Sequence, residues 1–157
     1  MQIHLTAAPP ADIRLMARVV NQGQALTGLD AALAALQPQR PGTPDAYVLT
    51  VALDSDPVFA REAREAARVL GARYAAQGRT LTLAGPDGAR DDAPHGSITA
   101  LRLAIAHIGS VMDGAEDVFV LYTTSHGNDL GLAYHWGDVG YGVLSPNGLK
   151  DALAEAG

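Results

Sequence analysis

Cysteine is absent from the 157-residue chain, and this absence excludes more chemistry than any other feature of the sequence. The sequence itself holds no disulfide framework, no thiolate metal ligand and no cysteine nucleophile. Aromatic residues are also few, at 5%, but apolar residues make up 48% of the chain, which is enough for one sizeable core. We therefore expect one compact folding unit whose chemistry does not rest on a thiol of its own.

Positively charged residues are also few. Lys and Arg together number 11 against 17 Asp and Glu, and Lys150 is the single lysine. The net charge of −6 repels a phosphate backbone, so we do not expect a nucleic acid partner. No apolar run approaches the ~18 residues of a membrane span, and the N-terminus lacks the basic and apolar regions of a signal peptide. These absences predict a soluble chain, cytoplasmic by default.

The chain divides into an N-terminal segment and a main domain. Apolar residues recur every three to four positions over residues 10–36, which predicts one or two amphipathic helices. Pro38, Pro41 and Pro44 then prevent a helix from continuing. We therefore expect a helical segment with a Pro-rich connector over 1–44 and the main domain over 45–157.

The main domain alternates strand and helix patterns. In chain order these are a strand over 46–53, a helix over 58–77 closed by Gly78, a strand over 80–83, a helix from 98 capped by Ser97, a strand over 118–124, a hairpin over 130–144 and a helix over 146–156 capped by Ser145. Leu149 and Leu153 are expected on the buried side of this last helix. Right-handed crossovers between such elements predict a three-layer α/β/α sandwich with a mostly parallel sheet, apparently incomplete at the C-terminus.

Candidate chemistry gathers where two of these strands end, which is where sites form in open α/β sheets. The last long strand runs into Ser125, His126 and Gly127. A histidine beside an open glycine N–H combines a base near neutrality with a donor to a developing oxyanion, as acyl transfer requires. Ser125 and His126 point to opposite faces of an extended strand, so the serine is interpreted as structural.

Asp54 and Asp56 follow the first strand and permit a different enzyme. They fit a Mg²⁺-dependent aspartyl phosphatase, with Asp54 as the nucleophile and Asp56 as the acid/base. Such an enzyme needs a cation for the phosphate, and Lys150 lies in the terminal helix. The same two carboxylates also fit a solvated turn with a helix-capping Asp.

The hairpin leaves two further interpretations open. His126, His135 and Asp138 have the ligand types of a zinc site, although the pattern gives them no fixed convergence. Tyr134, Trp136 and Tyr141, together with His135, fit a packed hairpin face or the wall of a cleft. A non-catalytic interaction module using this aromatic hairpin is therefore a third class of function.

Residues 118–127, VFVLYTTSHG, resemble the legumain-like cysteine peptidases, relatives of the caspases, in which an apolar strand ends in Ser/Asp-His-Gly. Residues 36–47, 56–62 and 144–157 are also similar to bacterial members, so the likeness covers most of the chain from about residue 33. The resemblance implies a caspase-like fold, peptide-bond hydrolysis after Asn or Asp, and no metal or organic cofactor.

The same resemblance implies roles for single residues. His126 corresponds to the catalytic histidine and Gly127 to a donor of the oxyanion hole. Arg61 and Asp54 are the candidate substrate-binding residues, Arg61 because a guanidinium suits an Asn or Asp side chain.

The chain departs from the family where the nucleophile should follow. In the family the catalytic Cys comes after the next strand, beyond the position of Gly157. We therefore expect no activity from this chain alone, whether it is the N-terminal portion of a longer peptidase, a subunit whose partner holds the Cys, or a degenerate homologue. Without that next strand the outer edge of Val118–Thr124 is left open, which predicts a homodimer through this edge or its covering by a missing C-terminal half.

Overall fold

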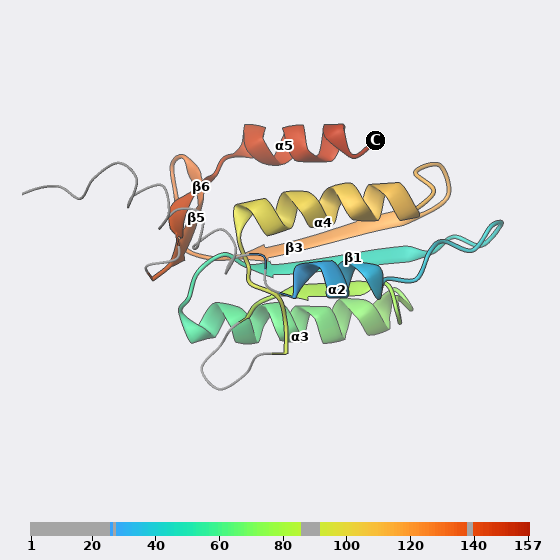
Figure 1. Cartoon of the computed structure of the whole chain (residues 1–157), viewed down its shortest axis with the longest axis horizontal. Helices are drawn as coiled ribbons and strands as arrows, with labels where there is room; N and C mark the ends of the chain where they lie inside the picture. Colours follow the sequence, from blue (N-terminus) through green and yellow to red (C-terminus); the bar gives the residue numbers. More distant parts are fainter. Residues whose placement is uncertain (1–25, 27, 86–91, 138–139) are drawn as a thin grey trace, which may run out of the picture.

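The computed structural model describes residues 26, 28–85, 92–137 and 140–157, and at its centre lies a parallel sheet (Figure 1). The sheet has the strand order β2-β1-β3, with β1 at Ala46–Ala52, β2 at Thr80–Leu83 and β3 at Val118–Thr124. All of β1 is buried, as expected for an apolar, β-branched run between two neighbouring strands. The described part of the chain thus has the mixed α/β architecture that the sequence predicts.

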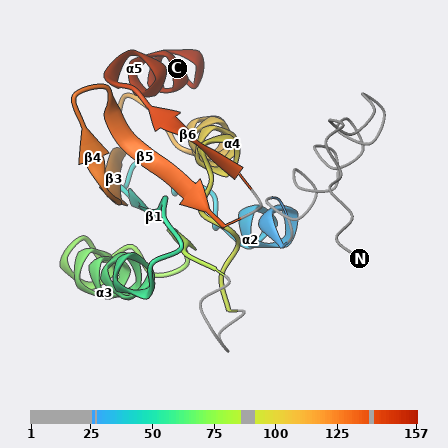
Figure 2. The same ribbon diagram turned by 90° about the vertical axis from the view of Figure 1, so that its left-hand side faces the viewer.

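Helices cover both faces of this sheet (Figure 2). On one face, Leu49, Val51 and Leu53 of the β1 segment pack with buried residues of α4, which spans Ile98–Val111. On the other face, Ala52 packs with Ala60 and Ala63 of α3, which spans Pro57–Arg73. The expected helix–sheet–helix layering is therefore present.

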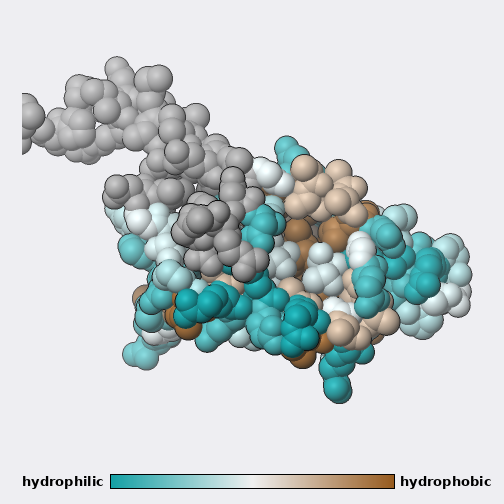
Figure 3. All heavy atoms as spheres, turned by 90° about the horizontal axis from the view of Figure 1, so that it is seen from below, coloured by the Kyte–Doolittle hydropathy of each residue, from teal (hydrophilic) through white to brown (hydrophobic). Residues whose placement is uncertain are grey.

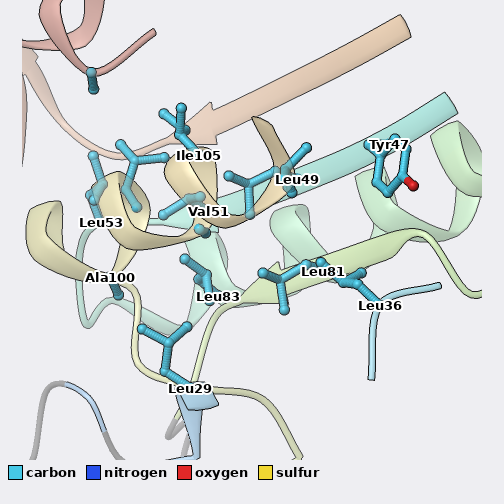
Figure 4. Close-up of a cluster of buried hydrophobic side chains, with 14 of the residues drawn as sticks. Leu29, Leu36, Tyr47, Leu49, Val51, Leu53, Leu81, Leu83, Ala100 and Ile105 are labelled. Atoms are coloured by element: carbon cyan, nitrogen blue, oxygen red, sulfur yellow. The ribbon is translucent and has the colours of Figure 1, made fainter. Parts of the chain in front are cut away.

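The larger core lies on the α4 face (Figure 4). It is built from leucines, isoleucines and small residues of the sheet and of α4, and its fully buried side chains include Tyr47, Leu49, Leu83, Leu101 and Ile108. Helix α5, Pro146–Glu155, packs on the outer side of α4 and adds Ala152 to this core.

Side-chain caps begin the helices where the sequence predicts them. The Ser97 hydroxyl accepts from the Ala100 N–H at 3.0 Å, and the Ser145 hydroxyl accepts from the Gly148 N–H at 3.1 Å. Each cap satisfies a backbone donor that the helix leaves without a partner. The neighbouring Gly96 lets the chain before α4 approach the end of β1, because a Cβ on this residue would lie 1.8 Å from the carbonyl oxygen of Ala52.

Two expectations about helix boundaries and faces are wrong. Helix α3 ends at Arg73 rather than at residue 77, because Ala75 adopts a left-handed backbone with φ 51°. The helical spacing after Leu70 predicts Tyr74 on the apolar face, but this residue lies beyond the helix end and is 41% exposed. Gly78 (φ 76°) belongs to the turn that leads into β2 rather than to the helix end. On α5 Leu149 packs partly buried against the core, as expected, but the buried residue is Ala152 and Leu153 is 41% exposed.

The expected hairpin is part of a second, antiparallel sheet of three strands with the order β4-β5-β6. Strands β5 (Gly131–Trp136) and β6 (Gly140–Leu144) form the hairpin itself. The additional strand β4, Gly127–Asn128, pairs with β5 and is too short to leave a pattern in the sequence. This small sheet brings the histidine-glycine motif next to the hairpin.

The described part of the N-terminal segment joins the same core as the sheet. Helix α2, Leu29–Ala34, buries Leu29, and Leu36 is buried after it. The connector is held by Asp45, whose buried carboxylate accepts hydrogen bonds from the Arg40 side chain and forms an ion pair with Arg79. The Arg40 hydrogen bond holds the pKa of Asp45 below its ordinary value. The helical pattern expected over residues 10–25 lies outside the described residues.

No helix in the described residues has both the length and the apolar character needed to cross a bilayer.

We predict that Leu101→Ala lowers the free energy of unfolding by about 2–5 kcal/mol, because it leaves a cavity in the core of the α4 face. Urea denaturation measures this change. Leu103→Ala is the matched control on the same helix, since Leu103 is 44% exposed, and it should change stability by less than about 0.5 kcal/mol. Equal losses in the two variants would contradict this assignment of the core.

Candidate functional site

The candidate residues meet at the carboxyl ends of β1 and β3. These strands pair in register up to Ala52 and Thr124, so Asp54 and His126 both follow at the same edge of the sheet. Strand β5 crosses this edge and ties the two chain segments together: the His135 N–H donates to the Leu53 carbonyl, and the Ala133 N–H donates to the His126 carbonyl. The backbone around the candidate site is therefore fixed from two strands at once.

The imidazole of His126 is exposed while its backbone is held. Its ring meets the edge of Phe59, with ring centroids 5.0 Å apart and an interplanar angle of 83°. Phe59 lies in the first turn of α3, so the start of that helix supports one side of the histidine. The rest of the ring is available to a ligand.

The N–H of Gly127 points away from β5. Because the Ala133 N–H donates to the His126 carbonyl, Gly127 and Leu132 face each other as a non-hydrogen-bonded pair of the antiparallel ladder. Space does not demand a glycine here, since an added Cβ would meet its nearest neighbour, the Gly131 carbonyl oxygen, at 3.9 Å. The residue thus offers an open backbone donor next to an exposed imidazole.

The Ser125 side chain is hydrogen-bonded to the backbone. Its hydroxyl donates to the carbonyl of Ala133 and strengthens the junction of β3 with β5. This contact supports the interpretation of Ser125 as a structural residue.

The two aspartates organise the turn after β1. Asp54 is buried, and its Oδ1 accepts from the Asp56 N–H at 2.9 Å, while its Oδ2 lies 3.9 Å from Nδ1 of His135. Asp56 caps α3 by accepting from the Val58 N–H at 3.1 Å. These hydrogen bonds favour the turn-and-cap interpretation over a pair of carboxylates that hold Mg²⁺.

The described residues hold no converging group of three or more His, Asp or Glu side chains that could bind a metal ion. Asp138, the third ligand of the zinc alternative, lies outside the described residues.

Arg61 lies in a different place from the histidine. It lines a groove of about 560 Å³ between α3 and β3, together with Glu62, Glu65 and Tyr122. The Thr124 hydroxyl donates to the Glu62 carboxylate at the end of this groove. His126 and Asp54 are not among the lining residues, so the structure does not bring Arg61 together with them.

An apolar hollow of about 400 Å³ has Gly127 among its lining residues. Leu132 of β5, Leu144 at the end of β6 and Leu149 of α5 line it. The antiparallel sheet that carries Gly127 thus also presents an apolar surface beside it.

Sequence reasoning missed His95. This residue is buried behind the hairpin, with its Nε2 3.3 Å from the Tyr134 hydroxyl and its ring 4.3 Å from that of Trp136. Burial lowers its pKa to about 4. Because it lies in an irregular loop, only its contacts with β5, far along the chain, distinguish it from a solvated loop histidine. Tyr134 and Trp136 accordingly face inward, whereas Tyr141 is 82% exposed.

No family model, no curated protein and no solved structure matches this chain.

We predict that His95 makes the fold sensitive to mild acid. Its pKa is about 4 when folded and 6.5 ordinarily, so between these values the unfolded chain binds more protons and stability is lost as the pH falls. The unfolding free energy of the unchanged chain should fall by about 1–2 kcal/mol more between pH 7 and pH 5 than that of His95→Gln.

Urea unfolding at the two pH values measures this difference. His107→Gln on α4 is the control, and because it retains His95 it should keep the pH dependence of the unchanged chain. An identical pH dependence in His95→Gln would rule out His95 as its source.

Proposed function

We propose that this chain carries the histidine part of a legumain-like cysteine peptidase site within a caspase-like fold. The observation that carries the proposal is the exposed imidazole of His126 beside the open N–H of Gly127, at the carboxyl end of a parallel strand. The reaction is hydrolysis of a peptide bond after Asn or Asp. The chain is inactive alone, because its sequence contains no cysteine.

In the complete site His126 acts as the general base. It takes the proton of a cysteine thiol supplied from outside this sequence, and the thiolate attacks the carbonyl carbon of the substrate. The Gly127 N–H donates to the carbonyl oxygen as negative charge develops there. His126 then gives its proton to the leaving amine, and water hydrolyses the thioester to release the acid and restore the thiol.

The fixed backbone supports this assignment, because acyl transfer depends on orientation. The Ala133 N–H and carbonyl bind the His126 carbonyl and the Ser125 hydroxyl respectively, which holds β3 on both sides of the peptide between these residues. Phe59 limits the positions of the imidazole. The motif is therefore held by contacts that leave its reactive groups free.

Peptide or protein is the proposed substrate. Arg61 is the proposed contact for the Asn or Asp side chain, since its guanidinium can donate two parallel hydrogen bonds to an Asp carboxylate and can also donate to the amide oxygen of Asn. Asp54, the other candidate contact from the sequence, is buried and accepts from the Asp56 N–H, so we do not propose it as a substrate contact.

The first experiment is the intact mass of the natural gene product from its native cells, compared with the 16.3 kDa of this chain. The proposal expects a heavier product, or a 16.3 kDa product that co-purifies with a cysteine-bearing subunit. A 16.3 kDa product without such a partner would contradict the proposal, because neither the product itself nor a complex would contain the cysteine.

We predict that the natural product or complex hydrolyses peptides after Asn or Asp and that His126→Ala lowers kcat/KM by about 10³-fold or more. The assay is release of a fluorophore from Asn and Asp peptides. His107→Ala, a partly exposed histidine on α4, is the matched control and should retain full activity. Mg²⁺-dependent hydrolysis of a phosphate ester that Asp54→Asn abolishes would instead establish the phosphatase alternative.

A further inference from the structure

Two side chains of β5 contact the buried histidine behind the hairpin. The Tyr134 hydroxyl lies 3.3 Å from Nε2 of His95, and the ring centroids of Trp136 and His95 are 4.3 Å apart. Tyr134 and Trp136 stand on either side of His135 in the sequence, and the His135 N–H donates to the Leu53 carbonyl. His95 therefore contacts both neighbours of the residue that ties β5 to the end of β1.

The backbone of His95 is fixed by other contacts. It forms an isolated parallel bridge with Gly85, just after β2, and the Gly85 N–H donates to the Pro94 carbonyl at 3.0 Å. Two residues after His95, Ser97 caps α4. His95 is only 4% exposed, so its ring becomes solvated only when a surface packed against it moves. Because its own segment is anchored at both ends, the side chains of β5 are the ones that can move away.

The packing around Trp136 favours such a movement. The indole N–H is buried without a hydrogen-bond partner among the described residues. A buried donor without an acceptor has lost its hydrogen bond to water and gained none in return. Trp136 also lies outside the apolar clusters that the described residues form. Movement of β5 away from His95 would let water reach the indole N–H, which offsets part of the free energy that the opening requires.

Among the described residues no carboxylate compensates a proton on His95, because burial alone lowers its pKa. The groups that face the ring are the Tyr134 hydroxyl and the Trp136 indole from β5 and Gly85 from the end of β2, all uncharged in mild acid. Burial raises the pKa of Tyr134. An indole face attracts an imidazolium, but less strongly than burial of the charge opposes it here. A proton on His95 therefore favours any arrangement in which the ring meets water.

Other charged groups near this edge do not have the same effect. The His135 ring places Nδ1 3.9 Å from Oδ2 of Asp54, so a proton on His135 strengthens the contact of β5 with the turn after β1. On the side of the molecule where α3 lies, charged and apolar side chains mix at the surface (Figure 3), and Glu65 there pairs with Arg68. His95 is the group near β5 whose protonation opposes the packing of this strand.

We propose that a proton on His95 releases β5 from the ends of β1 and β3, so that mild acid opens this edge while the parallel sheet stays folded. The charged imidazole becomes solvated when Tyr134 and Trp136 move away from it. The parallel sheet keeps its own core with α4, which does not include Trp136.

The release reaches the candidate site through the backbone of β5. Ala133 and His135 belong to the same strand as the two aromatic residues and move with them. The His126 carbonyl then loses the Ala133 N–H, and the Leu53 carbonyl loses the His135 N–H. The release is a property of the fold, whereas its consequence for catalysis, the loss of a fixed position for His126, rests on the proposed function.

Hydrogen exchange of single backbone amides, followed by NMR in the full 157-residue chain, tests the release without any need for activity. The Ala133 and His135 amides report opening of β5, and the Val48 amide, bonded to the Arg79 carbonyl, reports global unfolding. With the intrinsic exchange rate at each pH taken into account, opening at Ala133 and His135 should increase at least about tenfold between pH 7 and pH 5. At both pH values these two amides should exchange at least about tenfold faster than Val48, because their opening is local.

Trp136 provides a second readout, because it is the single tryptophan of the chain. Quenching of its fluorescence by acrylamide should increase over the same pH range, while the far-UV circular dichroism stays that of the folded chain. His95→Gln and His95→Phe cannot be protonated at this position and should remove the pH dependence of both readouts. His95→Phe keeps a ring against Trp136, so it separates loss of the proton from loss of packing.

His135→Gln is the matched control on β5 and should keep the acid response of the unchanged chain. Exchange of the Ala133 and His135 amides at the rate of Val48 would overturn the local release, and so would an acid response that survives in both His95 variants. Failure of the peptidase assay would leave these results untouched, since none of them needs catalysis.

Discussion

The crossing of β5 over the ends of β1 and β3 is the constraint on which the rest of the site depends. Two hydrogen bonds, from His135 to Leu53 and from Ala133 to His126, join a strand of the antiparallel sheet to the parallel one. Without them the chain after β3 would be an ordinary loop with no reason to hold an imidazole in one place. The same crossing turns the Gly127 N–H away from β5 and packs Trp136 against His95. One backbone arrangement therefore fixes the backbone of His126, the direction of the Gly127 N–H and the contacts of the buried histidine behind the hairpin.

Polar groups at this edge of the sheet divide between structure and chemistry. Asp56, Ser125 and Asp54 are each engaged by nearby backbone, as buried or half-buried polar groups usually are. His126 differs, because only its backbone is engaged by β5 while its ring stays exposed. That contrast, rather than position at a strand end alone, distinguishes the candidate base from its neighbours.

The two edges of the parallel sheet differ: β2 forms one edge and β3 the other. The short strand β2 ends the sheet at one edge, whereas β3 presents an uncharged edge that has no partner among the described strands. Unpaired strand edges of this kind associate with further strands because their backbone groups are otherwise satisfied only by water.

The sequence by itself determined the strands of the parallel sheet, the hairpin and the capped starts of α4 and α5, because each of these rests on local periodicity or on a cap a few residues away. It also placed His126 and Gly127 at the end of a strand. Only the tertiary structure decided that α3 stops at Arg73, that Arg61 lies in a groove apart from the histidine, and that His95 is buried. The end of α3 follows from the left-handed backbone at Ala75, which no residue type in the sequence signals. The other two outcomes depend on contacts between residues distant along the chain, for which a single sequence holds no local signal.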